Sequence, residues 1–325
     1  MMSVQIVDYR PDPALDTDLA DLGYAAVFGW PDQSPITASL VRSWLRPAGT
    51  TATTLALHRG DAGRLLGAAA VTWPSTLDAP AYMWGPVVHP TAQRGGVGST
   101  LLGALSKVMA NRPGIRVITS EIPETRKAGW ALYESAGWRN TSAATLLTRT
   151  LPAPASLPTA VPVRTMRPGE YLDPALAELF AAARPELGYA TARDTFTRWT
   201  SDERYDPNGL LLADGPDGLL GAALIYPVTH NRYGQPHEAA LADLIVSTSL
   251  AAPAAGAVRD ALVGAALDVG ANLGAAVARA VVDDTDLIAT LHAAGFETVD
   301  QIRYYSLQPN YTACGVLRGQ SPLGS

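Results

Sequence analysis

The two halves of this 325-residue chain repeat one another in outline. Residues 4–11 are echoed by 161–168, residues 65–69 by 219–223, and residues 132–138 by 291–296. These pairs occur in the same order, and their separations of 157, 154 and 159 positions are nearly constant. Regular self-similarity of this kind indicates repeated structural units. The chain is therefore expected to contain two copies of one α/β fold.

A proline-rich stretch separates the two copies. Residues 151–158 contain three prolines, which cannot continue a helix or a central strand. The expected organisation is a first domain over residues 1–151, a linker over 152–160, a second domain over 161–310 and a tail over 311–325.

Composition limits the class of protein. With 47% hydrophobic and 17% charged residues, the chain is expected to build substantial cores. The sequence shows no signal peptide and no apolar run of membrane-spanning length, so we expect a cytoplasmic protein without membrane contact. The single cysteine, Cys314, excludes an internal disulfide framework and a cysteine-rich metal site. The net charge of −6 argues against extensive nucleic-acid contact.

A glycine-rich turn in the first copy carries the strongest chemical signal. The run 93–98 reads Gln-Arg-Gly-Gly-Val-Gly. It follows an apolar stretch over 82–88 that predicts a strand, and apolar residues at helical spacing predict a helix from 98 to 111. At such a turn several backbone N–H groups point into one space at the positive end of a helix dipole. Gly95, Gly96 and Gly98 have no β-carbon, so a phosphate could approach the main chain closely.

The turn and one further motif together carry a resemblance to a known family. The turn lacks the ending of a P-loop and the spacing of a dinucleotide fingerprint, but it matches Gln/Arg-x-x-Gly-x-Gly/Ala, the coenzyme A signature of the GNAT acyltransferases. Residues 128–138 resemble that family's second motif, a helix that carries Leu-Tyr-Glu and ends in Gly-Trp. Together the motifs make residues 1–150 similar to a GNAT domain.

The resemblance implies a mixed α/β sheet in each copy, and two tandem GNAT-like domains that form a pseudo-dimer. In the first copy we expect strands and helices as follows: strands over 4–9, 54–59, 65–73, 82–88 and 115–120, closing strands near 138–150, and helices over 14–28, 36–46, 98–111 and 126–136. Two central strands are expected to separate after Val87 and Val88, and the pantetheine arm of the coenzyme to lie in that gap.

The resemblance also implies which residues bind acetyl-CoA or another acyl-CoA, with no metal involved. The expected contacts are Val87, Val88, Gln93, Arg94, Gly95, Gly96, Val97, Gly98, Ser99 and Arg126. Arg94 is the expected phosphate partner. Relatives commonly have an asparagine at the position of Arg126, which leaves open whether this arginine contacts the coenzyme or forms a solvated helix start.

Amine attack on a thioester sets the expected catalytic roles. A backbone N–H at Val87 or Val88 would stabilise the developing oxyanion, and Tyr133 matches the family's tyrosine acid that protonates the leaving thiolate. The base is less determined: Glu121 is the first candidate, and Glu124, Tyr82 or a water chain are alternatives. The aromatic residues Trp130 and Trp138 are expected to pack a helix against the sheet.

The second copy is expected to keep the fold and lose the coenzyme site. Placing Val246 on Val88 sets Pro253 against Gly95 and Ala254 against Gly96. Proline removes a backbone donor from the turn. In this alignment His292 replaces Tyr133, and we expect it at a surface or interface.

The acceptor site is expected between the first two helices. Their joining loop, 28–33, contains Trp30 and Asp32; with Tyr82 and Trp84 it would supply aromatic walls, while Asp32 or Glu121 would hold a cationic amine.

Three functions remain open. The leading one is a CoA-dependent N-acyltransferase that acts on a small-molecule amine, as a monomer with its internal pseudo-dimer or as a homodimer. The second is an acyl- or aminoacyltransferase of natural-product biosynthesis, with a carrier-protein pantetheine or an aminoacyl-tRNA as donor. It would need a basic docking face around Arg112, Arg116, Arg126 and Lys127. The third is a non-catalytic acyl-CoA sensor.

Overall fold

The computed structural model describes most of the chain. The described residues are 4–47, 49–75, 79–112, 114–152, 161–167, 170, 174–184, 199–200, 202, 204–216, 218–228 and 238–308. The predicted linker beyond Pro152 and the predicted tail, which includes Cys314, lie outside these ranges.

The elements of the first half follow the predicted order. They are β1 (Val4–Asp8), α1 (Pro13–Val27), α2 (Ala38–Leu45), β2 (Thr50–Arg59), β3 (Leu65–Pro74), β4 (Ala81–Val88), α3 (Val97–Ala110), β5 (Ile118–Pro123), α4 (Lys127–Ser135) and β6 (Arg139–Thr150). Three predictions were wrong in detail. Strand β2 begins at Thr50, four residues before the predicted start at 54. Strand β5 lies three residues later than expected and contains Glu121, and the closing strands near 138–150 are one long strand.

The second half repeats this order from its central strands onward. Its elements are β7 (Val163–Thr165), α5 (Pro174–Ala183), β8 (Leu210–Gly215), β9 (Gly218–Val228), β10 (Glu238–Val246), α7 (Ala252–Asn272), β11 (Val277–Val282), α8 (Thr285–Ala293) and β12 (Glu297–Leu307). Strand β10 ends at Val246 as β4 ends at Val88, in agreement with the alignment made from the sequence.

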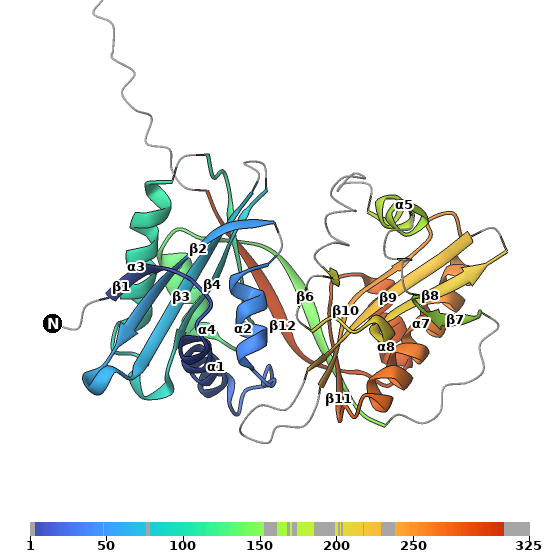
Figure 1. Cartoon of the computed structure of the whole chain (residues 1–325), viewed down its shortest axis with the longest axis horizontal. Coiled ribbons are helices and arrows are strands. Elements are labelled where there is room, and N and C mark those ends of the chain that lie inside the picture. Colours follow the sequence, from blue (N-terminus) through green and yellow to red (C-terminus); the bar gives the residue numbers. More distant parts are fainter. Residues whose placement is uncertain are drawn as a thin grey trace, which may run out of the picture.

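One sheet runs through both halves, and the halves exchange their last strands. The strand order is β1-β2-β3-β4-β5-β12-β6-β11-β10-β9-β8-β7. Strand β12 from the C-terminal half lies between β5 and β6, and β6 lies between β12 and β11 (Figure 1). Tyr305 of β12 consequently belongs to a core of the N-terminal half, while Leu147 and Leu151 belong to the core of the C-terminal half.

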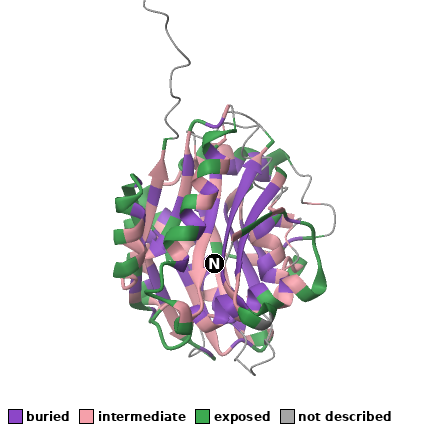
Figure 2. Ribbon diagram, turned by 90° about the vertical axis from the view of Figure 1, so that its left-hand side faces the viewer, coloured by how far each residue is buried: buried purple, intermediate pink, exposed green. Residues whose placement is uncertain are grey.

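In the N-terminal half, helices cover both faces of the sheet. One core joins α1 and α2 to the strands and includes Leu19, Val41 and Trp84; the other joins α3 and α4 and includes Met83, Leu101 and Tyr133. Figure 2 shows buried residues along the strands and exposed residues on the outward sides of the helices. Because side chains alternate across a strand, neighbouring residues of β4 and β5 serve opposite faces, hereafter the α1–α2 face and the α3–α4 face.

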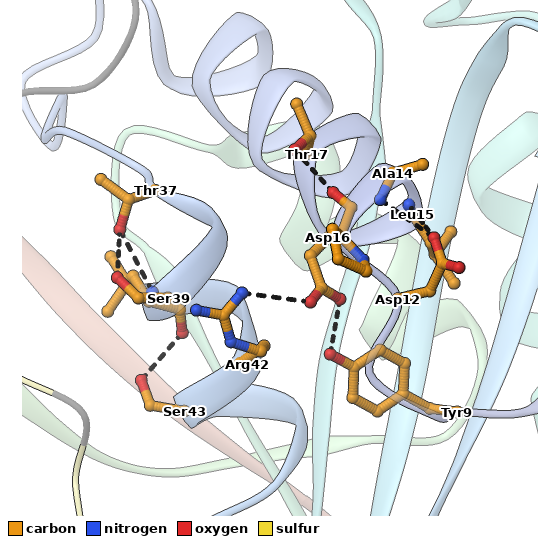
Figure 3. A network of polar contacts seen from close by, with 12 residues as sticks. Tyr9, Asp12, Ala14, Leu15, Asp16, Thr17, Thr37, Ser39, Arg42 and Ser43 are labelled. Carbon is orange, nitrogen blue, oxygen red and sulfur yellow. Dashed lines mark hydrogen bonds and ion pairs between the residues drawn. The ribbon is translucent and has the colours of Figure 1, made fainter.

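A buried carboxylate fixes α1 against α2. Asp16 is 1% exposed, accepts a 2.6 Å hydrogen bond from the Tyr9 hydroxyl and lies 3.3 Å from Arg42 on α2 (Figure 3). Helix α1 begins at Pro13 because Asp12 caps the N–H groups of Ala14 and Leu15. This network holds the first turn of α1 against the last turn of α2.

Candidate active site

Strands β4 and β5 separate to form a gap in the middle of the sheet. They pair in parallel at only two positions, Ala81 with Ile118 and Tyr82 with Thr119. The separation therefore begins after Tyr82, earlier than the predicted point after Val87 and Val88. Side chains take the place of the missing ladder: Ser120 donates to the Met83 carbonyl at 2.8 Å, and Tyr133 donates to the Gly85 carbonyl.

Strand β4 is irregular where it borders the gap. Its register with β3 shifts between Ala68 and Ala70, opposite Gly85 and Pro86, and Gly85 has a φ of 76°. A β-carbon on Gly85 would lie 2.7 Å from the Val87 nitrogen and 2.9 Å from the Ala68 carbonyl oxygen, so only glycine fits there.

The alternating hydrogen bonds between β3 and β4 determine which of the two candidate oxyanion donors, the N–H of Val87 or that of Val88, faces the gap. His89 N–H donates to the Leu66 carbonyl at 2.9 Å, so this pair is a hydrogen-bonded one. The register then makes Val87 with Ala68 the next hydrogen-bonded pair and Val88 with Gly67 a non-bonded pair. The N–H of Val87 points to β3, whereas the N–H and carbonyl of Val88 point into the gap. Gln93 Nε2 donates to that Val88 carbonyl at 3.1 Å.

Tyr133 reaches the gap from α4 on the α3–α4 face. Its side chain is 2% exposed, and its hydroxyl lies 2.8 Å from Ser120 Oγ. Burial raises the pKa of the Tyr133 phenol well above its usual value, and the nearby Glu121 acts in the same direction, whereas the hydrogen bond with Ser120 opposes the shift. Trp138 packs 4.8 Å from the Tyr133 ring and Tyr305 packs 5.7 Å from it. The phenol is thus rigidly held and protonated at neutral pH. Ser120 was not predicted as a site residue.

Glu121 lies on the α1–α2 face of the same strand. Its side chain is exposed at the sheet surface, yet enough protein surrounds it that desolvation raises the pKa of the carboxyl. Tyr82 donates a hydrogen bond to it, which lowers the pKa and so opposes the desolvation. A carboxylate with a raised pKa is suited to accept a proton near neutral pH.

The predicted alternative base Glu124 is engaged elsewhere. It forms a 2.6 Å ion pair with Arg303 of β12, and Arg303 stacks 4.0 Å above the Trp130 ring. Glu124 therefore binds the two halves together at the end of β5. His89, a second titratable group near the turn, contacts Arg64 at 2.7 Å and Thr91 at 2.8 Å.

The glycine turn forms an exposed helix N-terminus. Helix α3 begins at Val97 after Gly96, whose φ is 80°, and no side chain caps it. Arg94 also has a positive φ of 63°. Residues 93–96 are exposed, as is Ser99 in the first turn of the helix. The first N–H groups of a helix have no partner within it, and the two left-handed residues curve the preceding backbone around them.

Gly98 has a packing role that the sequence did not indicate. A β-carbon there would lie 3.2 Å from Leu132 Cδ2 and 3.7 Å from Val88 Cγ2. Glycine at this position lets α3 begin close to both α4 and β4. The turn and the gap are thereby brought next to each other.

Arg126 is not at the turn, contrary to its predicted place among the coenzyme contacts. Its guanidinium donates to the Ala26 carbonyl at 2.6 Å and to Asp32 at 2.8 Å, and it lies 4.4 Å from the Trp30 ring. Both charged side chains are largely buried, at 18% and 12% exposure. The departure from the family's asparagine thus serves the α1–α2 loop. Asp32, expected to hold an amine, is neutralised by this pair.

The aromatic residues predicted around the acceptor divide into two groups. Trp84 is buried in the α1–α2 core, 6.3 Å from Trp44, and does not line a site. Trp30 and Phe28 are exposed on the α1–α2 loop, at 41% and 63%. Tyr82 is half-buried beside Glu121.

In the second half, the described residues at the equivalent positions differ from those of the turn and of Tyr133. Helix α7 begins at Ala252 with Pro253 in its first turn, so positions 252–254, which align with the glycine turn, are helical. The predicted counterpart of Tyr133 was wrong by one residue: Trp138 N–H donates to the Tyr133 carbonyl, and the equivalent Phe296 N–H donates to the Leu291 carbonyl. His292 is exposed and contacts the Phe296 carbonyl at 3.0 Å.

We also searched the part of the chain that the structure describes for metal-binding groups and for membrane-spanning helices. No group of three or more His, Cys, Asp or Glu side chains in the described ranges is arranged to hold a metal ion. None of the helices that the structure describes combines the length and apolar character needed to cross a membrane.

Comparison with known proteins relates these features to a family. Residues 20–138 match the model of the acetyltransferase (GNAT) family. No curated protein matches the chain.

Solved structures resemble the chain over almost its full length. A tandem GNAT protein from the clavulanic acid biosynthesis pathway has a TM-score of 0.72 at 20% identity, covering 94% of this chain and 99% of that one. A GCN5-related N-acetyltransferase from Sphaerobacter thermophilus has a TM-score of 0.66 at 20% identity, covering 94% and 96%. An N-myristoyltransferase from Saccharomyces cerevisiae with bound myristoyl-CoA has a TM-score of 0.67 at 13% identity, covering 94% and 83%.

Proposed function

Because the chain is a tandem-domain acyltransferase of the GNAT superfamily, we propose that it transfers an acetyl group from acetyl-CoA to the amine of a small molecule. The observation that carries this proposal is the contrast between the halves. The N-terminal half combines an uncapped glycine turn with a tyrosine hydroxyl in the β4–β5 gap, and the equivalent segments of the C-terminal half are a helical turn and Leu291.

The residues of the N-terminal half fit acyl-CoA. The N–H groups at the start of α3, with Gly95, Gly96, Val97, Gly98 and Ser99, would hold the pyrophosphate. Arg94, exposed at the turn, would pair with a phosphate. The N–H and the carbonyl of Val88 face the gap where the pantetheine arm would lie; Gln93 donates to that carbonyl, and Val87 pairs with β3, so both fix this strand end.

When bound, acyl-CoA supplies the acyl group as an activated thioester. Glu121 would take the proton of the attacking amine, since its raised pKa suits a base and it lies on the α1–α2 face. The Val88 N–H would stabilise negative charge on the carbonyl oxygen as the new C–N bond forms. As the C–S bond breaks, Tyr133 would protonate the leaving sulfur. Solvent would then carry the proton that Glu121 has taken back to the Tyr133 phenolate, which restores both groups.

The titration of acetyl-CoA into the full chain by calorimetry tests the donor. We expect one site per chain, and two equivalent sites would contradict the proposal. Thiol release in the presence of an amine panel then tests turnover. Binding without turnover on any amine would favour a sensor, and turnover only with a carrier-protein or tRNA donor would favour the other acyltransferase class.

A further inference from the structure

Strand β12 brings a tyrosine from the C-terminal half beside the candidate base. Tyr304 lies directly opposite Glu121 in the antiparallel β5–β12 pair. Side chains of directly opposed residues share a face of the sheet, with β-carbons about 4.5–5.5 Å apart. Tyr304 therefore lies on the α1–α2 face, next to Glu121 and on the same side as Tyr82, the hydrogen-bond donor to Glu121.

The alternation along β12 separates this tyrosine from its neighbour. Tyr305 is 0% exposed and packs near Tyr133 on the α3–α4 face, where it completes the core. Tyr304 is half-exposed, and its backbone carbonyl accepts a 3.2 Å hydrogen bond from the Thr141 hydroxyl. A packing role thus explains Tyr305 and leaves the Tyr304 side chain available at the surface.

The charges around Tyr304 define what it could bind. Burial raises the pKa of the Tyr304 phenol to about 12, and the neighbouring Glu121 and Asp283 add to the shift. The phenol is therefore neutral and can both donate and accept hydrogen bonds. Glu121 and the phenols of Tyr82 and Tyr304 together form a polar patch on this face of the sheet, and Asp283 adds negative charge near Tyr304.

We propose that Tyr304 binds the acceptor, so that the acceptor site is built from both halves of the chain. The patch of Tyr82, Glu121 and Tyr304 would take a cationic aliphatic amine that carries hydroxyl groups or a second amine. The amine to be acylated is held at Glu121, and the Tyr304 hydroxyl holds a neighbouring polar group. This inference rests on the proposed function, because it assigns the acceptor of that same site.

Because the halves exchange strands, the N-terminal half depends on the C-terminal half for its acceptor site. Residues 4–150 carry the turn, the gap, Tyr133 and Glu121, yet without β12 they lack one wall of the acceptor patch. The C-terminal half would thus contribute directly to substrate recognition, although Leu291 stands in it where the N-terminal half has Tyr133.

The test compares the full-length wild type with Tyr304→Phe, which keeps the ring and removes one hydroxyl. Thr298→Val is the matched control, because Thr298 is exposed on the same strand opposite Leu147, away from Glu121. Glucosamine, ethanolamine and spermidine serve as hydroxylated or polyamine probes, with cyclohexylamine as the apolar probe. Binding is measured by ligand-observed NMR, turnover by thiol release and acetyl-CoA affinity by calorimetry.

We expect Tyr304→Phe to raise the KM or Kd of the best polar amine by about tenfold, the effect of one hydrogen bond. The turnover number and the acetyl-CoA Kd should stay within about twofold, and Thr298→Val should match the wild type throughout. Unchanged amine affinity in Tyr304→Phe would overturn the role of this residue. Binding of cyclohexylamine alone, or of none of the four probes, would overturn the stated acceptor class. If the wild type does not bind acetyl-CoA in calorimetry, this would instead count against the proposed function.

Discussion

Tyr133 and Leu291 occupy equivalent positions in the two halves. Each is buried, and each carbonyl accepts the hydrogen bond of an aromatic residue five positions later, Trp138 at 3.1 Å and Phe296 at 2.9 Å. The same helix end therefore presents a hydroxyl in one half and a methyl-tipped side chain in the other. A general acid requires a transferable proton, so only the first of these helices can supply one from this position.

The first prediction concerns the hydroxyl of Tyr133. Tyr133→Phe should lower turnover by about 10²–10⁴-fold, the usual contribution of a general acid, with little change in acetyl-CoA affinity. Steady-state rates and calorimetry check the two parts.

Tyr226→Phe is the matched control for this variant, because Tyr226 is also buried and donates to a carbonyl, that of Trp199 at 3.0 Å. It should lose stability to a similar degree and keep its turnover. Wild-type turnover in Tyr133→Phe, with chemistry shown to limit the rate, would remove the assignment.

The second prediction is a pH dependence set by Glu121. Desolvation raises the pKa of this carboxyl, so kcat/KM should increase with pH as the base form appears. Glu121→Gln should abolish this acidic limb and lower kcat/KM by about 10²–10⁴-fold. Tyr82→Phe removes a hydrogen bond that lowers the pKa, so its acidic limb should move to higher pH. A profile of Tyr82→Phe displaced to lower pH would contradict the assignment.

Thermal stability should respond to Glu121 in the opposite sense to activity. A carboxyl with a folded-state pKa above its unfolded value disfavours folding once pH rises through the folded-state pKa. Glu121→Gln should therefore melt at the wild-type temperature or higher at pH 8. A clearly lower melting temperature would mean that the carboxylate stabilises the fold.

The third prediction compares the effect of substituting a glycine in the turn, Gly96, with that of substituting a glycine in the helix, Gly103. A β-carbon added to Gly96 or Gly103 would meet no atom within 4 Å, but only Gly96 has a left-handed φ, of 80°. Gly96→Ala should cost about 1–2 kcal/mol of conformational energy and weaken acetyl-CoA binding, and Gly96→Pro should abolish it. Gly103→Ala should instead raise the melting temperature through better helix propensity and leave the Kd unchanged. Calorimetry on the three variants decides the point.

The fourth prediction concerns how the C-terminal half holds the α1–α2 loop. Arg279 of β11 donates to the Gln33 carbonyl at 2.6 Å, and its Nε lies 2.9 Å from Glu238, which accepts from Ser34 at 3.0 Å. Both charged side chains are buried, at 13% and 6% exposure. Arg279→Ala should destabilise the protein by about 3–5 kcal/mol, because it leaves a buried carboxylate unpaired, and should raise the acceptor KM.

Arg259→Ala provides the comparison for that variant. Its partner Asp286 is 70% exposed, and exposed pairs contribute at most about 1 kcal/mol. Thermal unfolding should rank the two variants accordingly. Equal melting temperatures would show that the Arg279 pair does not anchor the loop.

Local features of the site could be predicted from the sequence. The turn at 93–98 follows from glycines between a strand and a helix, because the conformations involved depend on neighbouring residues alone. The position of Tyr133 could be predicted for the same reason, because helix α4 is also specified by neighbouring residues. The equivalence of Tyr133 with His292 was wrong because the repeated segments differ by one residue in length, and only the hydrogen bonds at the helix ends reveal the register.

Long-range features could not be predicted in the same way. Nothing near Tyr304 in the sequence indicates that it pairs with Glu121, because such pairing depends on the exchange of β6 and β12. The position of Arg126 also depends on a distant segment, since Asp32 and the Ala26 carbonyl are its partners. A motif residue that departs from the family pattern can thus acquire a role which only tertiary contacts define.

The last prediction is that residues 1–156 do not form an active protein alone. Removal of the C-terminal half would take away both β11 and β12, which would leave β5 paired only with β4, at Ile118 and Thr119, and would expose β6 on both sides. Unpaired strand edges and the apolar side chains of Leu147 and Leu151, which belong to the other core, favour aggregation. Size-exclusion chromatography should therefore show aggregates or no soluble fragment. Co-expression with residues 159–325 should restore a soluble, active complex, because the exchanged strands and not the linker join the halves. A fragment of residues 1–156 that is soluble, monomeric and as active as the full chain would contradict this dependence.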